Sequence, residues 1–213
     1  MKTPLRRRTL ALTQFAMLLA IEAVVCFTPL GSLPAVGPIV ATLAMVPVII
    51  TAILLGTGAG AAMGAFAGLF SFLIWTFTPP NPLVAFVFTP FYTLGTTQGN
   101  LWSLVICFVP RILTGVAAGA CFNLFTRLKW RSVFVYGLSG ALASLVNTFG
   151  VLGGIYLFFG RTYASVLGKG FELLLGLIGL TVLTSGVPEA IVGGVLANAI
   201  CRPLQKYMAR DSA

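Results

Sequence analysis

The stretch LVICFVPRILTGVAAGACF, at residues 104–122, is apolar almost throughout, yet it carries Arg111 directly after Pro110. A guanidinium cannot be deprotonated in a protein, and a charge at the middle of a bilayer costs at least ~2.5–3.5 kcal/mol on insertion scales. A membrane span needs roughly 20 apolar residues, so the stretch is long enough to form most of one. It therefore predicts a membrane helix whose single charge faces protein or water and not lipid.

The composition of the whole chain also indicates a membrane protein. Of the 213 residues, 58% are hydrophobic and 8% are charged, and the mean hydropathy is +1.03. Soluble domains carry roughly 25% charged residues, so this chain has too few charges to cover a water-facing surface. We therefore expect an all-α integral membrane protein with a single domain at residues 1–213 and no sizeable soluble domain.

Six apolar segments are candidates for transmembrane helices. We expect these spans at residues 9–27, 38–55, 59–77, 101–126, 132–159 and 173–201. The first lacks a clear small-residue cleavage site, so we expect a retained helix and not a signal peptide. The long connector at residues 79–100 contains an apolar patch at 83–92. That patch either dips into the outer leaflet, folds over a cavity or belongs to an ordinary connector.

The basic residues predict the orientation of the chain. They cluster before the first span, between the fourth and fifth spans and after the sixth, as Lys2, Arg6, Arg7, Arg8, Arg127, Lys129, Arg131, Arg202, Lys206 and Arg210. With six spans all three clusters fall on one side, which the positive-inside rule makes the cytoplasm. Both termini are then cytoplasmic. This topology accounts for the net charge of +9, so we expect no nucleic-acid partner.

Three ionisable side chains lie within the predicted spans: Glu22, Arg111 and Glu189. Arg111 and Glu189 each follow a proline, which withholds an amide hydrogen from the carbonyl four residues earlier. We expect both helices to expose a carbonyl near the charge. Either Arg111 and Glu189 pair and lock spans four and six, or they line an outward-facing cavity and contact a polar ligand. We expect Glu22 at the membrane interface, with a smaller role.

Other polar residues are candidate ligand contacts. Asn147 and Thr148 lie in the middle of the fifth span, where they either contact a ligand or join helices through hydrogen bonds. The predicted outer connectors add possible lid contacts at Thr28, Asn81, Tyr92 and Gln98.

Small residues recur at helical spacing in two spans. Gly60, Gly64 and Gly68 share one face of the third span, and Ala16 and Ala20 lie one turn apart in the first. Such faces let neighbouring helices approach closely. Packing within the chain explains the glycines, whereas the alanines are candidates for contact with a partner subunit.

The chain lacks the residues of several catalytic sites. It has no histidine, which excludes Ser-His and Cys-His pairs and an HExxH zinc site. Its only aspartate is Asp211, and it has no GxxxxGK[ST] motif for ATP. Without a CxxC pair, we expect the cysteines to be small buried apolar side chains and not metal ligands or disulfides: Cys26, Cys107, Cys121 and Cys201. Binding or transport is therefore favoured over catalysis.

Five segments, taken in order, resemble the substrate-binding S components of energy-coupling factor (ECF) vitamin importers. They are FTPLGSLPAVG (27–37), ATLAMVPVIITAILLGTGAGAAMGAFAGLFSF (41–72), VPRILTG (109–115), LVNTFGVLGGIY (145–156) and GVPEAIV (186–192). The resemblance implies a six-helix bundle in the bacterial plasma membrane that binds a vitamin at its outer face. It also implies docking, through an AxxxA pattern matched by Ala16 and Ala20, to a transmembrane coupling protein with two ATPase subunits. ATP is then used by those partners, and no cofactor is expected on this chain.

Within that family the chain is most similar to the pantothenate-type branch, although Met45 stands where that branch is expected to have a histidine. Pantothenate has a carboxylate and hydroxyls that would suit Arg111 and Asn147, whereas riboflavin, the rival substrate, would need aromatic stacking and amide hydrogen bonds. The expected substrate-binding residues are Arg111, Asn147, Thr148, Glu189, Tyr92 and Asn81. Two other functions stay open: an autonomous ion-coupled secondary transporter or channel, and a membrane scaffold without a small ligand.

Overall fold

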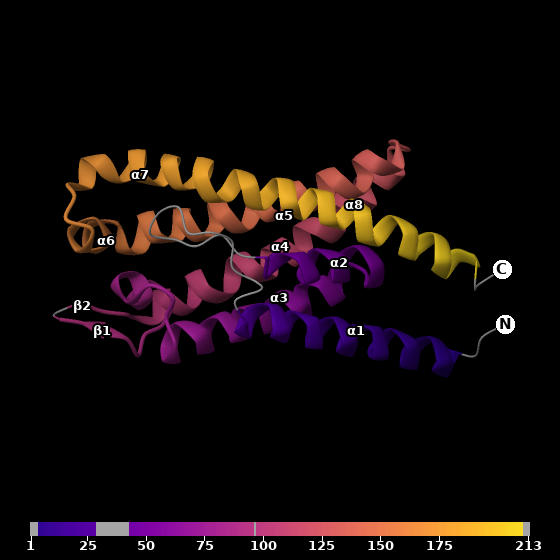
Figure 1. Cartoon of the computed structure of the whole chain (residues 1–213), viewed down its shortest axis with the longest axis horizontal. Coiled ribbons are helices and arrows are strands. Elements are labelled where there is room, and N and C mark those ends of the chain that lie inside the picture. Colours follow the sequence, from indigo (N-terminus) through magenta and orange to yellow (C-terminus); the bar gives the residue numbers. More distant parts are fainter. Residues whose placement is uncertain (1–3, 29–42, 96, 211–213) are drawn as a thin grey trace.

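The computed structural model describes residues 4–28, 43–95 and 97–210 and is largely helical (Figure 1). The longer helices are α1 (Pro4–Phe27), α2 (Met45–Leu55), α3 (Thr57–Phe77), α4 (Leu101–Arg127), α5 (Ser132–Gly154) and α8 (Val187–Arg210). Shorter helical elements are the 3₁₀ turns η2 (Pro82–Val87) and η4 (Phe171–Leu173), the π-helical segments η3 (Ile155–Phe159) and η5 (Val182–Gly186), and α6 (Gly160–Val166) and α7 (Leu174–Thr181). Two short strands, β1 (Thr93–Leu94) and β2 (Thr97–Gln98), pair antiparallel.

Five helical segments of the described residues are long and apolar enough to cross a membrane. They are Arg8–Phe27, Thr57–Phe77, Leu101–Arg127, Ser132–Val166 and Phe171–Tyr207, and each coincides with a predicted span. The remaining predicted span, 38–55, differs. Its described part is α2, whose 11 residues cover only about 16 Å at 1.5 Å per residue. Residues 38–42 lie outside the described residues, so a sixth crossing stays a prediction.

The fifth helix extends beyond the predicted span at 132–159, because α5 continues through η3 and α6 to Val166. Gly160 does not end this helix. A Cβ on Gly160 would lie 2.9 Å from the Phe171 ring and 3.3 Å from Leu174. The glycine therefore gives room for the next helix to pack alongside. The chain reverses later, at Gly168, whose φ of +66° suits a residue without a side chain.

The outside of the bundle is apolar. Leu12, Leu157 and Leu183 are 70%, 75% and 67% exposed. Exposing such side chains to water would forfeit about 25 cal/mol for each Å² of apolar surface, whereas lipid tails accept them. The exposed apolar surface and the five long helices together identify a multi-pass membrane protein.

Glycines bring the helices together in the interior. On α3, a Cβ on Gly64 would collide with the backbone carbonyl of Arg111 on α4, and one on Gly68 would lie 2.9 Å from Phe108. The predicted close-packing face of α3 is therefore confirmed. Helices α5 and α8 cross in the same way, since a Cβ on Gly140 would lie 2.6 Å from the carbonyl oxygen of Gly193.

The molecule has two distinct ends in Figure 1. The start of α1 and the end of α8 lie at one end, and the β1–β2 hairpin lies at the other. The core is likewise divided in two. One cluster of buried side chains includes Met45, Ile49 and Met63, and the other includes Trp75 and Phe88.

Candidate substrate-binding cavity

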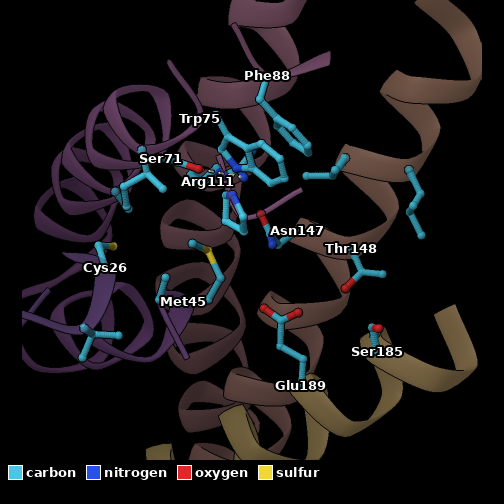
Figure 2. A pocket seen from close by; sticks show the side chains of 18 of the residues that line it. Cys26, Met45, Ser71, Trp75, Phe88, Arg111, Asn147, Thr148, Ser185 and Glu189 are labelled. Carbon is cyan, nitrogen blue, oxygen red and sulfur yellow. Dashed lines mark hydrogen bonds between the residues drawn. The ribbon is translucent and has the colours of Figure 1, made fainter. Parts of the chain in front are cut away.

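A cavity of about 470 Å³ is bordered by both core clusters. This volume lies within the roughly 300–1,000 Å³ of typical small-molecule sites. The end of α1, the start of α2, and parts of α3, α4, α5 and the continuous α7–η5–α8 segment line it, and Figure 2 shows many of the lining side chains. Its polar lining comprises Thr28, Ser71, Thr78, Arg111, Asn147, Thr148, Thr181, Ser185 and Glu189, and its apolar lining includes Met45, Ile74, Trp75, Phe88, Val151 and Leu152.

Arg111 is held in place by a backbone carbonyl that Pro110 leaves without an amide partner. Its Nη1 donates a hydrogen bond of 2.8 Å to the carbonyl oxygen of Ile106. Proline withholds its amide from the carbonyl four residues earlier, and Ile106 is that residue, so the expected exposure of a carbonyl near the charge is confirmed in α4. The Nη2 group donates a second hydrogen bond, of 3.3 Å, to Ser71 Oγ on α3.

Aromatic side chains border the guanidinium on one side. Its Cζ lies 5.5 Å from the centroid of the Phe88 ring, within the range of a cation–π interaction. The Phe88 ring stacks in turn on Trp75, with centroids 4.4 Å apart. Phe88 follows directly after η2, whose Val84 and Phe86 are fully buried. Within the apolar patch at 83–92, Phe88 therefore lines the cavity, whereas insertion of the patch into the outer leaflet stays a prediction.

Arg111 and Glu189 both line the cavity but do not form an ion pair. Among the described residues, no carboxylate oxygen lies within 4.0 Å of the Arg111 guanidinium. Arg111 is 8% exposed, and its buried Nε has no hydrogen-bond partner, nor has the buried Oε1 of Glu189. A buried charge without a partner is strongly destabilising. Among the described residues, neither side chain is neutralised by an opposite charge, which suits a cavity that binds a polar ligand.

The α5 and α8 side of the cavity carries the other expected polar residues. Asn147 is 9% exposed and its Oδ1 has no partner, while Thr148 Oγ1 donates a hydrogen bond of 3.3 Å to the Ser144 carbonyl. Helix α5 approaches η5 closely here, because a Cβ on Gly186 would lie 2.6 Å from Thr148 Cγ2. Segments of π-helix inside longer helices are frequent at functional sites.

Two of the expected substrate-binding residues lie elsewhere. Asn81 does not line the cavity, and its side chain caps η2 by accepting a hydrogen bond of 3.1 Å from the Leu83 amide. Tyr92 packs against the second core cluster. Of the further lid candidates, Gln98 is exposed on β2 and Thr28 lines the cavity.

The expected position of Glu22 at the membrane interface stays a prediction, and the structure shows that its side chain faces the protein interior. It is fully buried, and its Oε1 accepts a hydrogen bond of 3.2 Å from Cys26 Sγ, while Oε2 has no partner. Hydropathy gives the depth of a residue along a helix but not the face on which it lies. Glu22 is on the inward face of α1, one turn from Cys26, which lines the cavity.

Ala16 and Ala20 are both exposed on α1 and do not line the cavity. Leu12, one turn earlier, is exposed as well. These three residues form a continuous stripe on the outside of the bundle. Their predicted contact with a partner subunit stays a prediction.

Several lining residues were not predicted. Ser71 lies one turn beyond Gly68, so it continues the glycine face of α3, and that spacing was a usable signal. Trp75 and Phe88 gave no such signal, since aromatic residues are common throughout this chain. Met45, where the sequence departs from the expected histidine, is 4% exposed and borders the cavity.

The profile described as "ECF transporter, substrate-specific component" matches residues 10–204. The chain is 35% identical to "Pantothenic acid transporter PanT" of Lactococcus lactis subsp. cremoris over 171 residues, which cover 79% of this chain and 80% of that protein. It is 33% identical to "Pantothenate transporter PanT" of Leuconostoc mesenteroides subsp. mesenteroides over 163 residues, covering 75% and 72%.

Proposed function

Because the chain belongs to the family of ECF transporter substrate-specific components, we propose that it captures pantothenate for ATP-driven uptake across the bacterial plasma membrane. Two relatives at 35% and 33% identity are named as transporters of this vitamin. Pantothenate has a carboxylate, an amide and two hydroxyls. It therefore offers both an anion and hydrogen-bonding groups to a cavity lined by polar side chains.

The observation that carries the proposal is that Arg111 borders the cavity without a carboxylate partner among the described residues. Its guanidinium borders the cavity, is held by Ile106 and Ser71, and has no carboxylate within 4.0 Å among the described residues. The planar fork of a guanidinium matches a carboxylate. The carboxylate of the vitamin supplies the missing partner, and Asn147 bonds the adjacent part of the ligand.

We propose six crossings with both termini in the cytoplasm, α2 and the residues before it forming the second crossing. Figure 1 places the start of α1 and the end of α8 at the same end of the molecule, as an even number of crossings requires. Arg127 ends α4, Lys129 and Arg131 lie between α4 and α5, and Arg202 and Lys206 lie in the last part of α8. The positive-inside rule then orients the cavity toward the outer half.

We propose that a separate motor supplies the energy: a transmembrane coupling protein with two ATPase subunits. The chain has no GxxxxGK[ST] motif with which to bind ATP itself. The exposed stripe of Leu12, Ala16 and Ala20 on α1 is the docking surface for the coupling protein. Small side chains in such a stripe permit a close helix–helix contact.

Two measurements test the function. Titration calorimetry of the detergent-purified chain should detect pantothenate binding and no comparable binding of riboflavin. Proteoliposomes that also contain the coupling protein and ATPases should then import pantothenate only when ATP is present. Tight riboflavin binding without pantothenate binding would overturn the proposed substrate. Uptake driven by a proton or sodium gradient without ATPases would overturn the coupled mechanism.

A further inference from the structure

The Arg111 side of the cavity offers hydrogen-bond donors. A guanidinium has five N–H groups and no acceptor. Two of its nitrogens already donate, to Ile106 and Ser71, and Nε has no partner. The groups that remain can only be satisfied by an acceptor.

Hydrogen-bond acceptors face the cavity where α5, α7 and α8 border it. Thr148 and Thr181 both line it, and their hydroxyls donate to the carbonyl oxygens of Ser144 and Leu177 at 3.3 and 2.9 Å. A hydroxyl whose only hydrogen is used in this way can only accept from a ligand. Glu189 Oε1 is buried without a partner among the described residues, and a carboxyl oxygen can accept a hydrogen bond.

The donors and acceptors are separated within one cavity. Figure 2 shows Arg111 on one side of Asn147, and Thr148 and Glu189 on the other. A buried acceptor without a donor costs about 1–3 kcal/mol, and more when it is charged. A ligand that donates no hydrogen bond to the acceptors around Glu189 therefore binds more weakly than a ligand that does.

We propose that Glu189, Thr148 and Thr181 form an acceptor end that selects substrates with hydroxyl groups at the end remote from their carboxylate. The carboxylate lies at Arg111 and the hydroxyls donate to the acceptor end. This inference rests on the proposed function and adds to it the orientation of the substrate and the origin of its selectivity. Glu189 is then a specificity-determining residue and not a partner of Arg111.

The test compares two ligands that share a carboxylate. One is pantothenate and the other is N-(3,3-dimethylbutanoyl)-β-alanine, which keeps the amide and the branched apolar body but lacks both hydroxyls. Titration calorimetry of the full chain in detergent gives the ratio of their dissociation constants. We expect the analogue to bind wild type at least about tenfold more weakly, since a site that bonds a hydroxyl rejects a ligand without it.

Variants assign this selectivity to the acceptor end. Glu189→Leu should weaken pantothenate binding and bring the dissociation constants of pantothenate and the analogue to within about threefold of each other. Glu189→Gln keeps an acceptor oxygen, so it should preserve most of the wild-type difference between the two ligands. Thr181→Val, which keeps the shape and removes the hydroxyl, should lower the ratio in part. Asn198→Leu is the matched control, because Asn198 lies on the same helix with a buried, partnerless Oδ1 but does not line the cavity.

The outcomes separate the inference from the function. A wild-type ratio near one, or a ratio unchanged in both Glu189→Leu and Thr181→Val, would overturn the acceptor end and leave pantothenate capture standing. Absence of pantothenate binding to wild type would overturn the proposed substrate and the inference together. A requirement for added sodium that disappears in Glu189→Leu would instead make Glu189 a cation site and overturn the inference.

Discussion

Arg111 illustrates how one residue becomes tolerable inside a membrane helix. Pro110 removes the amide partner of the Ile106 carbonyl, and the guanidinium bonds that carbonyl at 2.8 Å. Ser71 and the Phe88 ring fix the remaining faces. The side chain is thereby held in one position before any ligand arrives, and pre-organisation of this kind lowers the entropy lost on binding.

Replacing Arg111 should affect the ligand more than the fold. We expect Arg111→Ala to weaken pantothenate binding at least tenfold, or about 1.4 kcal/mol, because Arg111 is the one cation among the described residues that line the cavity. Arg111→Lys keeps the charge but loses the planar fork, so it should give an intermediate loss. Calorimetry of the purified variants measures both effects. Arg161→Ala removes an exposed cation outside the cavity and is the control; equal affinities in wild type and Arg111→Ala would reduce Arg111 to a structural role.

Pro110 should influence binding although it does not line the cavity. Pro110→Ala restores an amide that can bond the Ile106 carbonyl, and this amide competes with Arg111 for the same oxygen. We expect pantothenate to bind several-fold more weakly, with the cavity lining unchanged in sequence. Pro203→Ala, in the helix interior of α8 beyond the cavity, should leave binding unaltered. A Pro110→Ala protein with wild-type affinity in calorimetry would show that the carbonyl is not needed to hold the guanidinium.

At the scale of the helices, the α3–α4 contact positions Arg111. A Cβ on Gly64 would collide with the Arg111 carbonyl oxygen and lie 2.9 Å from Ile112 Cα, both of them backbone atoms that cannot rotate away. The same face continues to Ser71, which bonds the guanidinium. Close helix packing and the proposed ligand recognition therefore depend on one surface of α3.

We expect Gly64→Ala to destabilise the protein by about 1–3 kcal/mol, the usual effect of overpacking a close contact. It should also weaken pantothenate binding, because the backbone of Arg111 must move. Thermal unfolding in detergent measures the first effect and calorimetry the second. Gly58→Ala is the control on the same helix, since a Cβ there meets nothing within 4 Å. Equal stabilities of the two variants would contradict the close approach.

The sequence predicted those features that composition and spacing encode. Arg111, Asn147, Thr148 and Glu189 were found because polar residues are rare in apolar runs, and all four line the cavity. The face on which Glu22 lies was not predicted, because it depends on which helices pack against α1. The extension of α5 through Gly160 was not predicted either, because a glycine ends a helix in one context and admits a neighbouring helix in another.

At the scale of the whole molecule, the proposed binding and docking surfaces are separate. The cavity lies inside the bundle, whereas Ala16 and Ala20 are exposed on the outer face of α1. Substrate capture and coupling can therefore be disrupted independently.

Bulky substitutions on α1 test this separation. Ala16→Trp and Ala20→Trp should leave pantothenate binding within about twofold of wild type, because neither residue lines the cavity. Both should abolish ATP-dependent uptake by preventing the close helix–helix contact. Leu157→Trp, on another exposed part of the bundle, should not affect uptake. Normal transport by both alanine variants in proteoliposomes would place the docking surface elsewhere.

The π-helical turn at η5 has a consequence for the spacing of the chain. Successive residues of an α-helix are about 100° apart around the axis, because 3.6 residues complete one turn. The π-helical turn already accommodates one residue more than an α-helical turn, so inserting a further residue into Val182–Gly186 would rotate Thr181 by about that angle relative to Glu189. Thr181 and Glu189 could then no longer both point into the cavity. The number of residues in this turn thus matters as much as their identity, so a single-residue insertion should abolish recognition where point substitutions only weaken it.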